Sequence, residues 1–268
     1  ERVSKQAASF IGSIPENYDR FLGPRIFYDF AEDIANRVLD FQPQNVLELA
    51  AGTGILTQRL RQKLPRGCHI TATDLNPPML DIAKSKLQAD DKLNFESADA
   101  TDLPYKASAF DTVVCQFGVM FFPEIQRSYE EVFRTLKPGG QYVFNVWGSL
   151  KSNPFARIAH ETVTEFFPDD PPGFYQVPFG YNDTDVITAS VTDAGFTNVS
   201  VEQLSITSKI PCSADFARGL VFGNPLFDEI TSRGGDPDKV CSVISDELER
   251  QLGEVMPLAA MVIVAEKG

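Results

Sequence analysis

The sequence predicts an α/β protein built on one doubly wound, mostly parallel sheet. Apolar runs of strand length alternate with helical segments over residues 46–147. The first apolar run ends in a glycine-containing turn that leads straight into a helix. Two further strand-like segments come late in the chain, with helical segments between them. We therefore expect seven strands, helices on both faces, and an antiparallel last strand.

The composition favours one domain over residues 1–268. The chain has 268 residues and is 43% hydrophobic, which is enough for one full core. Its net charge of −13 would repel phosphate backbones and anionic membranes. We expect a small-molecule substrate and no nucleic-acid partner, whereas a cationic ligand would not be repelled. The oligomeric state is not indicated.

The cysteines and histidines give no sign of a metal centre. Cys68, Cys115, Cys212 and Cys241 show no metal-ligand spacing, and the chain has two histidines. Neither a zinc site nor a disulfide framework is expected, and a reduced, cytoplasmic chain is the default. No apolar run approaches the ~20 residues of a membrane span.

The strongest local pattern is VLELAAGTG, residues 46–54, followed by the helical segment 55–64. A strand, a glycine turn and a helix in this order bring backbone close to a ligand and aim a helix N-terminus at it. A second predicted strand, 70–73, ends at Asp74, 20 residues after Gly54. An acidic residue at this distance typically binds the ribose hydroxyls of an adenosine ligand.

With these motifs the chain resembles the class I S-adenosylmethionine-dependent methyltransferases. Residues 48–54 match the family pattern E-x-G-x-G-x-G, with Ala50 in place of the first glycine. A dinucleotide fingerprint would need another glycine where Thr57 stands, which disfavours a nicotinamide dehydrogenase. The resemblance implies a Rossmann-like sheet of strand order 3-2-1-4-5-7-6, with S-adenosylmethionine as cofactor and S-adenosylhomocysteine as product.

A second motif narrows the resemblance. The turn LKPGG, residues 136–140, precedes a predicted fifth strand, 141–147, and should end the helix before it. This pair is typical of the family, and the matching motifs cover residues 46–147. The chain is similar to the type 11 group, which includes the ubiquinone and menaquinone biosynthesis methyltransferases.

The remaining elements follow from hydrophobic periodicity and turn residues. Residues 1–45 should be helical and 149–181 irregular. A helix should end at Gly195, and helices should begin at caps Ser213, Asn224 and Asp236. The other predicted strands are 93–97, 112–116, 198–210 and 256–265. The core would comprise about 40–150, 182–210 and 256–268. Segments 1–30, 150–181 and 211–254 would form a lid, because their many aromatic residues must bury against something.

The resemblance also implies a set of cofactor-binding residues. Tyr18 occupies the place of a tyrosine that contacts the cofactor in similar enzymes, and Asp99 the place of a carboxylate beside the adenine amine. Each has a simpler interpretation, core packing for the N-terminal aromatic residues and a turn cap for Asp99. The expected set is Tyr18, Glu48, Ala50, Gly52, Gly54, Asp74, Leu75, Met79, Asp99, Ala100, Gln116 and Phe117.

Methyl transfer from a sulfonium is a direct displacement, so the enzyme mainly aligns the reacting atoms and needs no metal. If the acceptor must lose a proton, His160 is the candidate base, because its ordinary pKa of about 6.5 suits that role. A histidine on a helix face is the simpler interpretation. Fifteen of the 21 phenylalanines lie between Phe110 and Phe227, and this surplus favours a small, partly hydrophobic or aromatic acceptor. A nucleic-acid or protein methylase and a non-catalytic binding protein of the same fold are the alternatives.

Overall fold

The computed structural model describes residues 6–268 and contains a seven-stranded sheet of order β3-β2-β1-β4-β5-β7-β6. Its strands are β1 (Asn45–Leu49), β2 (His69–Asp74), β3 (Leu93–Ser97), β4 (Phe110–Gln116), β5 (Leu136–Trp147), β6 (Thr197–Lys209) and β7 (Val255–Glu266). The first five pair in parallel, and β7 runs antiparallel to β5 and β6. The predicted fold class, strand order and place of the last strand are confirmed.

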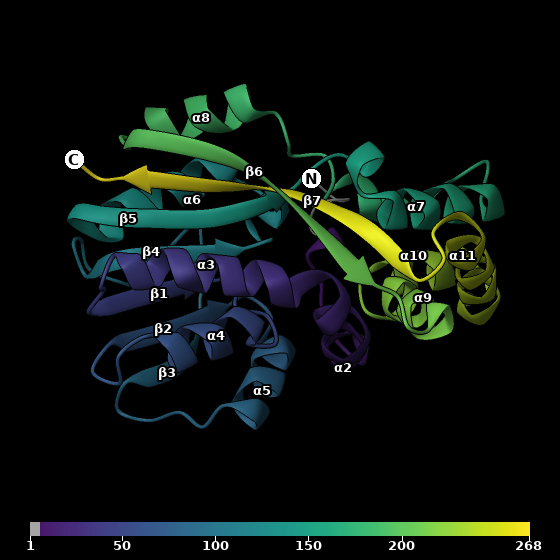
Figure 1. Ribbon diagram of the computed structural model, residues 1–268, viewed down its shortest axis with the longest axis horizontal. Coiled ribbons are helices and arrows are strands. Elements are labelled where there is room, and N and C mark those ends of the chain that lie inside the picture. Colours follow the sequence, from purple (N-terminus) through teal and green to yellow (C-terminus); the bar gives the residue numbers. More distant parts are fainter. Residues whose placement is uncertain (1–5) are drawn as a thin grey trace.

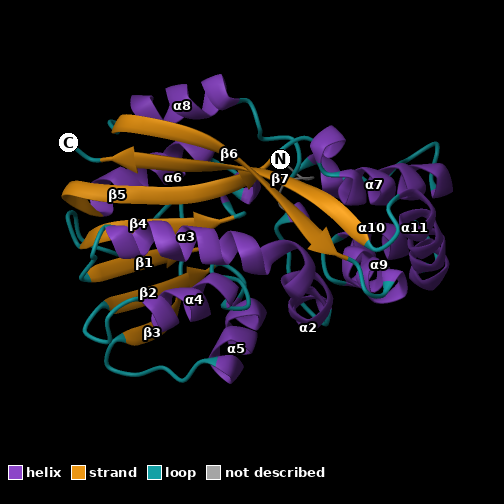
Figure 2. Cartoon of the chain, in the orientation of Figure 1, coloured by secondary structure: helices purple, strands orange, loops and turns teal. Residues whose placement is uncertain are grey.

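Helices cover both faces of this sheet (Figure 2). They are α2 (Ile14–Asn17), α3 (Tyr28–Asp40), α4 (Ile55–Lys63), α5 (Pro77–Lys86), α6 (Ile125–Thr135), α7 (Pro154–Phe166), α8 (Thr184–Asp193), α9 (Ser213–Phe222), α10 (Leu226–Ser232) and α11 (Pro237–Gln251). A π-helix, η1 (Tyr18–Phe27), joins α2 to α3, and short 3-10 turns are η2 (Val119–Phe121), η3 (Leu150–Ser152) and η4 (Phe174–Gln176). No helix among residues 6–268 is long and apolar enough to cross a membrane.

The late helices gather at one end of the sheet. In Figure 1, α7, α9, α10 and α11 lie together beyond the carboxyl ends of β1, β4 and β5, with α2 beside them. The carboxyl ends of parallel strands are where α/β sheets bind ligands, next to the point where the strand order reverses. Here that point lies between β1 and β4, which are neighbours in the sheet.

The central strands are buried because they are covered on both faces. Val46, Leu47 and Leu49 of β1 are each at most 1% exposed. An apolar run of this kind, without alternation, is typical of a parallel strand between two helical layers. The helix α3 packs on β4 and β5 from one side, and α6 packs on β5 from the other.

Three parts of the sequence prediction need correction. The segment 149–181 is not simply irregular, because α7 begins at Pro154 and buries Phe155, Ile158, Ala159 and Val163, a helical spacing that the surrounding prolines obscured. The helix α6 ends at Thr135, so residues 136–140 form the irregular start of β5 and not a separate turn. The N-terminal helices include an unpredicted π-helix.

The predicted helix starts are nearly correct. Asp236 is an N-cap whose side chain accepts a hydrogen bond from the backbone of Asp238, whereas Ser213 is the first residue of α9 and Asn224 lies one residue before the N-cap of α10. Part of the proposed N-terminal lid, residues 1–5, lies outside the described residues.

Candidate functional site

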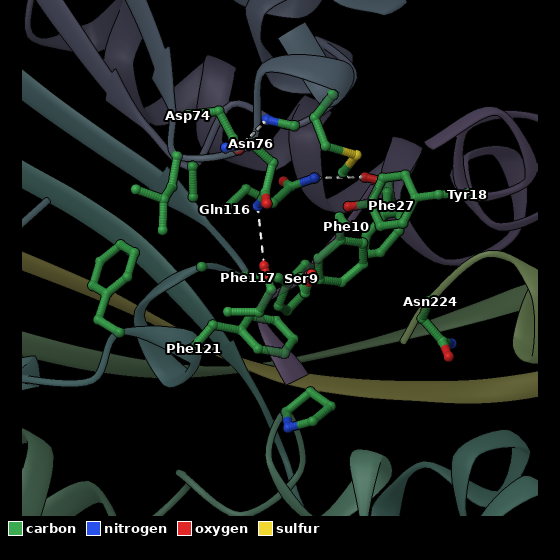
Figure 3. Close-up of a pocket in the computed structure, with 18 of the residues that line it drawn as sticks. Ser9, Phe10, Tyr18, Phe27, Asp74, Asn76, Gln116, Phe117, Phe121 and Asn224 are labelled. Atoms are coloured by element: carbon green, nitrogen blue, oxygen red, sulfur yellow. Dashed lines mark hydrogen bonds between the residues drawn. The ribbon is translucent and has the colours of Figure 1, made fainter. Parts of the chain in front are cut away.

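A cavity of about 470 Å³ opens at the carboxyl ends of β1, β2 and β4. Its lining comes from the loops after these strands and from three segments remote in sequence: the N-terminal helices, residues 155–179, and the end of α9 (Figure 3). Polar groups from the strand ends and aromatic rings from the covering segments therefore share one space. The cavity has a polar part near Asp74 and an apolar part near Trp147.

Asp74 organises the polar part. It is buried, and its two carboxylate oxygens accept hydrogen bonds from the backbone N–H groups of Gly52 (2.9 Å) and Asn76 (2.8 Å). Burial raises the pKa of the Asp74 carboxyl, while these two bonds oppose that effect. Each oxygen has a second lone pair, so Asp74 can still accept hydroxyl groups from a ligand.

The glycine turn is shaped by packing as well as by the cavity. Gly54 has a φ of +84°, and a Cβ there would lie 2.9 Å from the Cβ of Ala83 on α5. Gly54 therefore allows α4 and α5 to approach each other, and it does not line the cavity. The cavity lining therefore leaves out this expected cofactor-binding residue. Gly52 does line the cavity, with the side chains of Met79 and Tyr18 about 4 Å or less from where its Cβ would stand.

Glu48 lies next to the main cavity, not in it. It lines a small adjoining hollow together with Thr53 and Gln116. The hydroxyl of Thr57 donates to one Glu48 oxygen, and burial raises the pKa of the Glu48 carboxyl to about 8. The Oγ1 of Thr53 and the Oε1 of Gln116 are buried with no partner among the described residues. This cluster of oxygen atoms can accept hydrogen bonds from an ammonium group.

Tyr18 and Asp99 both line the cavity, and each also forms a contact that stabilises the fold. Tyr18 lines the cavity and also stacks on Phe27 with 4.8 Å between ring centroids, so it both packs and faces the site. Burial, with Asp74 and Asp19 nearby, raises the pKa of Tyr18, which keeps its hydroxyl neutral. Asp99 caps a turn by accepting from the backbone of Thr101 (2.8 Å), and it also lines the cavity.

Most of the expected cofactor-binding residues line the cavity. They are Tyr18, Ala50, Gly52, Asp74, Leu75, Met79, Asp99, Ala100, Gln116 and Phe117. The structure does not bring His160, the candidate base, to the cavity. The residue lies on α7, and burial lowers its pKa. The ordinary pKa of a histidine does not determine which side of α7 its ring occupies.

The apolar part contains residues that sequence reasoning did not assign. Trp147 lies at the end of β5 and stacks on Phe117 with 3.9 Å between centroids and 5° between planes. Phe179 stacks near Trp147 at 5.3 Å, and Phe155 meets both rings edge-on. One signal was available for Trp147, because the carboxyl end of a predicted parallel strand is a site position.

The ionisable side chains that the described residues contribute to the cavity are acidic or phenolic, and none is basic. Its ionisable lining residues are Tyr18, Asp74, Asp99 and Tyr175, and no lysine, arginine or histidine lines it among the described residues. The Tyr175 hydroxyl donates to the carbonyl of Leu220 (2.7 Å) and accepts from Asn224 (3.3 Å). Nor does any group of three or more histidine, cysteine, aspartate or glutamate side chains in residues 6–268 form a possible metal site.

Part of this sequence is similar to known proteins. Residues 46–140 match the family described as a methyltransferase domain. The demethylmenaquinone methyltransferase of Clavibacter sepedonicus is 39% identical over 100 residues, 37% of this chain and 40% of that protein. The enzyme of the same name from Thermus thermophilus is 39% identical over 106 residues, 39% of this chain and 48% of that protein. The alignments thus span less than half of either relative.

Structural similarity extends further along the chain than sequence similarity. Phosphoethanolamine N-methyltransferase 2 of Haemonchus contortus has a TM-score of 0.64 and 15% identity, covering 99% of this chain and 60% of that one. At this identity the comparison supports the fold alone. Together, the sheet order, the glycine turn with Asp74 and the sequence relatives show that the chain contains a class I S-adenosylmethionine-dependent methyltransferase domain of the type 11-like group.

Proposed function

We propose that the protein transfers the methyl group of S-adenosylmethionine to a small, flat, apolar acceptor of the kind found among quinone precursors. The observation that carries this proposal is the single cavity that joins the Asp74 part to the uncharged aromatic part around Trp147. A methyl donor held by the first part would face an acceptor packed in the second. When bound, S-adenosylmethionine supplies a sulfonium methyl group that can transfer by direct displacement.

The residues of the polar part fit this cofactor. Asp74 has free lone pairs for the two ribose hydroxyls, and Met79 and Leu75 lie beside it with apolar surface for the adenine. The unpartnered oxygens of Thr53 and Gln116 would accept from the ammonium group of the methionine part. A buried polar atom without a partner is costly, which supports a ligand as the missing partner.

The apolar part fits an acceptor without phosphate or carboxylate groups. No basic side chain of the described residues lines it, so an anionic group would be buried without a counter-charge. The same lack of basic residues, with the net charge of −13, argues against a nucleic-acid substrate. Since no histidine or lysine of the described residues is present there to remove a proton, the acceptor should carry its own electron-rich atom. A ring carbon activated by a neighbouring ionised hydroxyl group meets this requirement, and after the methyl group has transferred the ring hydrogen leaves as a proton to water.

The sequence relatives support the same class, since two of them carry names that specify methylation of demethylmenaquinone. Their menaquinone precursor is a naphthoquinone, which is flat and apolar. Stacked aromatic rings such as Phe117 and Trp147 can bind a flat ring by offset or edge-on packing.

Methyl transfer to a reduced naphthoquinone would test this function. The purified protein is incubated anaerobically with S-adenosylmethionine and either 1,4-dihydroxynaphthalene or phosphoethanolamine, and products are analysed by mass spectrometry. We expect the dihydroxynaphthalene to gain one methyl group and phosphoethanolamine to stay unchanged. Binding of S-adenosylhomocysteine is measured in parallel by calorimetry. Tight binding without methylation of any flat aromatic compound would contradict the proposed acceptor class, and no binding would contradict the cofactor assignment.

A further inference from the structure

Phe117 has an unusual backbone at a sensitive place. It directly follows β4, at the point where the strand order reverses, and its φ is +48°. A bulky residue rarely adopts this left-handed conformation, because its Cβ crowds the following carbonyl oxygen. Such a conformation persists only where the surroundings fix it, and it is frequent at functional sites.

Asn145 supplies the fixing contact. The backbone N–H of Phe117 donates to the side-chain oxygen of Asn145 at 2.9 Å and, more weakly, to its backbone oxygen at 3.2 Å. Asn145 lies on β5 opposite Gln116 of β4 and is 0% exposed. This places the amide oxygen directly beside the first residue of the loop.

The other half of the Asn145 amide is unused. Its Nδ2 is buried and has no hydrogen-bond partner among the described residues. An unpaired buried amide group is costly, and a leucine could fill the same volume without that cost. Of its two polar side-chain atoms, only the oxygen forms a contact, and that contact is with Phe117. General sheet stability therefore does not explain an asparagine at this position.

The conformation of Phe117 determines where its ring lies. The ring stacks on Trp147 at 3.9 Å and meets Phe30 edge-on at 5.2 Å, and both Phe117 and Trp147 line the cavity. If Phe117 relaxed to a negative φ, the ring would leave this stack. Trp147 thus stacks both on Phe117 of the loop after β4 and on the covering residue Phe179.

We propose that Asn145 is a positioning residue that holds Phe117 in its left-handed conformation, so that the Phe117–Trp147 stack forms the wall against which a flat aromatic acceptor packs. The identity of the acceptor rests on the proposed function. The role of Asn145 in fixing the stack does not, because it follows from contacts within the chain.

Fluorescence can report on the stack directly, because Trp147 is the single tryptophan of the chain. Asn145→Leu removes the amide oxygen at similar volume, and Asn145→Asp keeps an acceptor oxygen at the same place. We expect the emission of Trp147 to shift to longer wavelength in Asn145→Leu, with faster quenching by acrylamide. In Asn145→Asp, which keeps an oxygen that accepts from the Phe117 N–H, the emission should stay as in the unchanged protein.

Ligand binding separates a role at the wall from a general structural role. The affinity for 1-naphthol, a flat two-ring phenol, is measured by calorimetry in the presence of S-adenosylhomocysteine. In Asn145→Leu it should fall roughly fivefold, as loss of one neutral hydrogen bond would give. The affinity for S-adenosylhomocysteine should fall by less, because that ligand also depends on Asp74 and the other residues of the polar part. Asn145→Asp should restore the affinity for 1-naphthol. Equal loss of both ligands, or unchanged emission and 1-naphthol affinity, would overturn the proposal.

Two further variants serve as checks. Thr135→Val removes a buried hydroxyl just before the other end of β5 and should change neither Trp147 emission nor 1-naphthol affinity.

Phe117→Leu removes the stacked ring and tests the wall even if Asn145→Leu does not fold. Its 1-naphthol affinity must fall, and unchanged affinity overturns the proposal. If the unchanged protein binds S-adenosylhomocysteine but not 1-naphthol, the proposed acceptor class fails, whereas the emission of Asn145→Leu still decides the role of Asn145.

Discussion

Ala50 stands where the family pattern has its first glycine, and it adopts a φ of +50°. The Ala50 methyl group occupies space that is free because its neighbour Gly118 has no side chain. A Cβ built on Gly118, in the loop after β4, would lie 2.5 Å from the Ala50 Cβ and 2.8 Å from the Sγ of Cys115. The alanine at position 50 and the glycine at position 118 are therefore complementary across the ends of β1 and β4.

This complementarity predicts non-additive stability changes. Gly118→Ala should lower the free energy of unfolding by about 1–3 kcal/mol through overpacking. Ala50→Gly should change it by less than about 1 kcal/mol, because relief of the left-handed strain offsets the greater freedom of the unfolded chain. The double variant should be more stable than the sum implies, since one of the two clashes is gone. Chemical denaturation of the four proteins measures this, and additive values would contradict the pairing.

Asp74 allows a direct test of the cofactor site. Asp74→Ala should weaken S-adenosylhomocysteine binding by about 1.5–3 kcal/mol, the range for hydrogen bonds to a charged group. Asp74→Asn keeps one acceptor oxygen and the side-chain shape, so it should lose less. Calorimetry gives both affinities, and circular dichroism checks that each variant remains folded. Equal affinity in a folded Asp74→Ala protein would exclude the assignment.

At the scale of elements, the π-helix η1 explains how the N-terminus reaches the cavity. Tyr18 and Phe27 are its first and last residues, and both line the cavity. Their nine-residue separation equals about two and a half turns of an α-helix, which would put the two rings on opposite faces. The wider π-helix brings them together, as their stacking at 4.8 Å shows.

The proposed lid predicts a pattern of hydrogen exchange. Cofactor-binding elements that close over a ligand should be protected when it binds, whereas a helix already packed on the sheet should not. S-adenosylhomocysteine should slow exchange in 18–30 and 155–179 more than in 81–87, which covers most of α5. Mass spectrometry of peptides with and without the ligand measures this. Equal protection of all three regions would mean that the covering segments are ordinary core.

At the scale of the whole molecule, the buried acid Glu48 couples stability to pH. Its folded pKa of about 8 lies above the ordinary value of 4.5, with burial as the largest cause. Between these values the folded state binds more protons than the unfolded state. The contribution of neutral Glu48 is thus complete below about pH 4.5 and is lost as the pH rises through about 8.

Glu48→Gln should remove this dependence. In thermal unfolding of the ligand-free protein between about pH 5 and 8, the variant should lose less stability with rising pH than the unchanged protein. Substitution of the exposed Glu254 by glutamine is the control and should leave the slope unchanged. If Glu48→Gln follows the same curve as the unchanged protein, Glu48 is not the group responsible.

Local sequence patterns determine the fold class of this protein and much of its cavity lining. The uninterrupted apolar run of β1 predicts a strand that is covered on both faces. The glycine turn, together with Asp74 at the end of β2, predicts a nucleotide-type site at the carboxyl edge of the sheet. These features depend on residues close in sequence, whose backbone preferences and burial follow from their own side chains. The fold class and most of the expected lining residues could be predicted for that reason.

The apolar part of the cavity and the surroundings of His160 and Gly54 depend on tertiary packing and are known only from the structure. The apolar part of the cavity brings together Phe27, Trp147, Phe179 and Leu220, which are far apart in sequence, and nothing local in any of these segments indicates that they meet. The position of the His160 ring could not be predicted for the same reason, because the ring could have faced either side of α7. Gly54 was assigned to a ligand, although its missing side chain makes room for Ala83 of another helix. Which segments pack together depends on the long-range burial of apolar surface, and that is settled only when the whole chain folds.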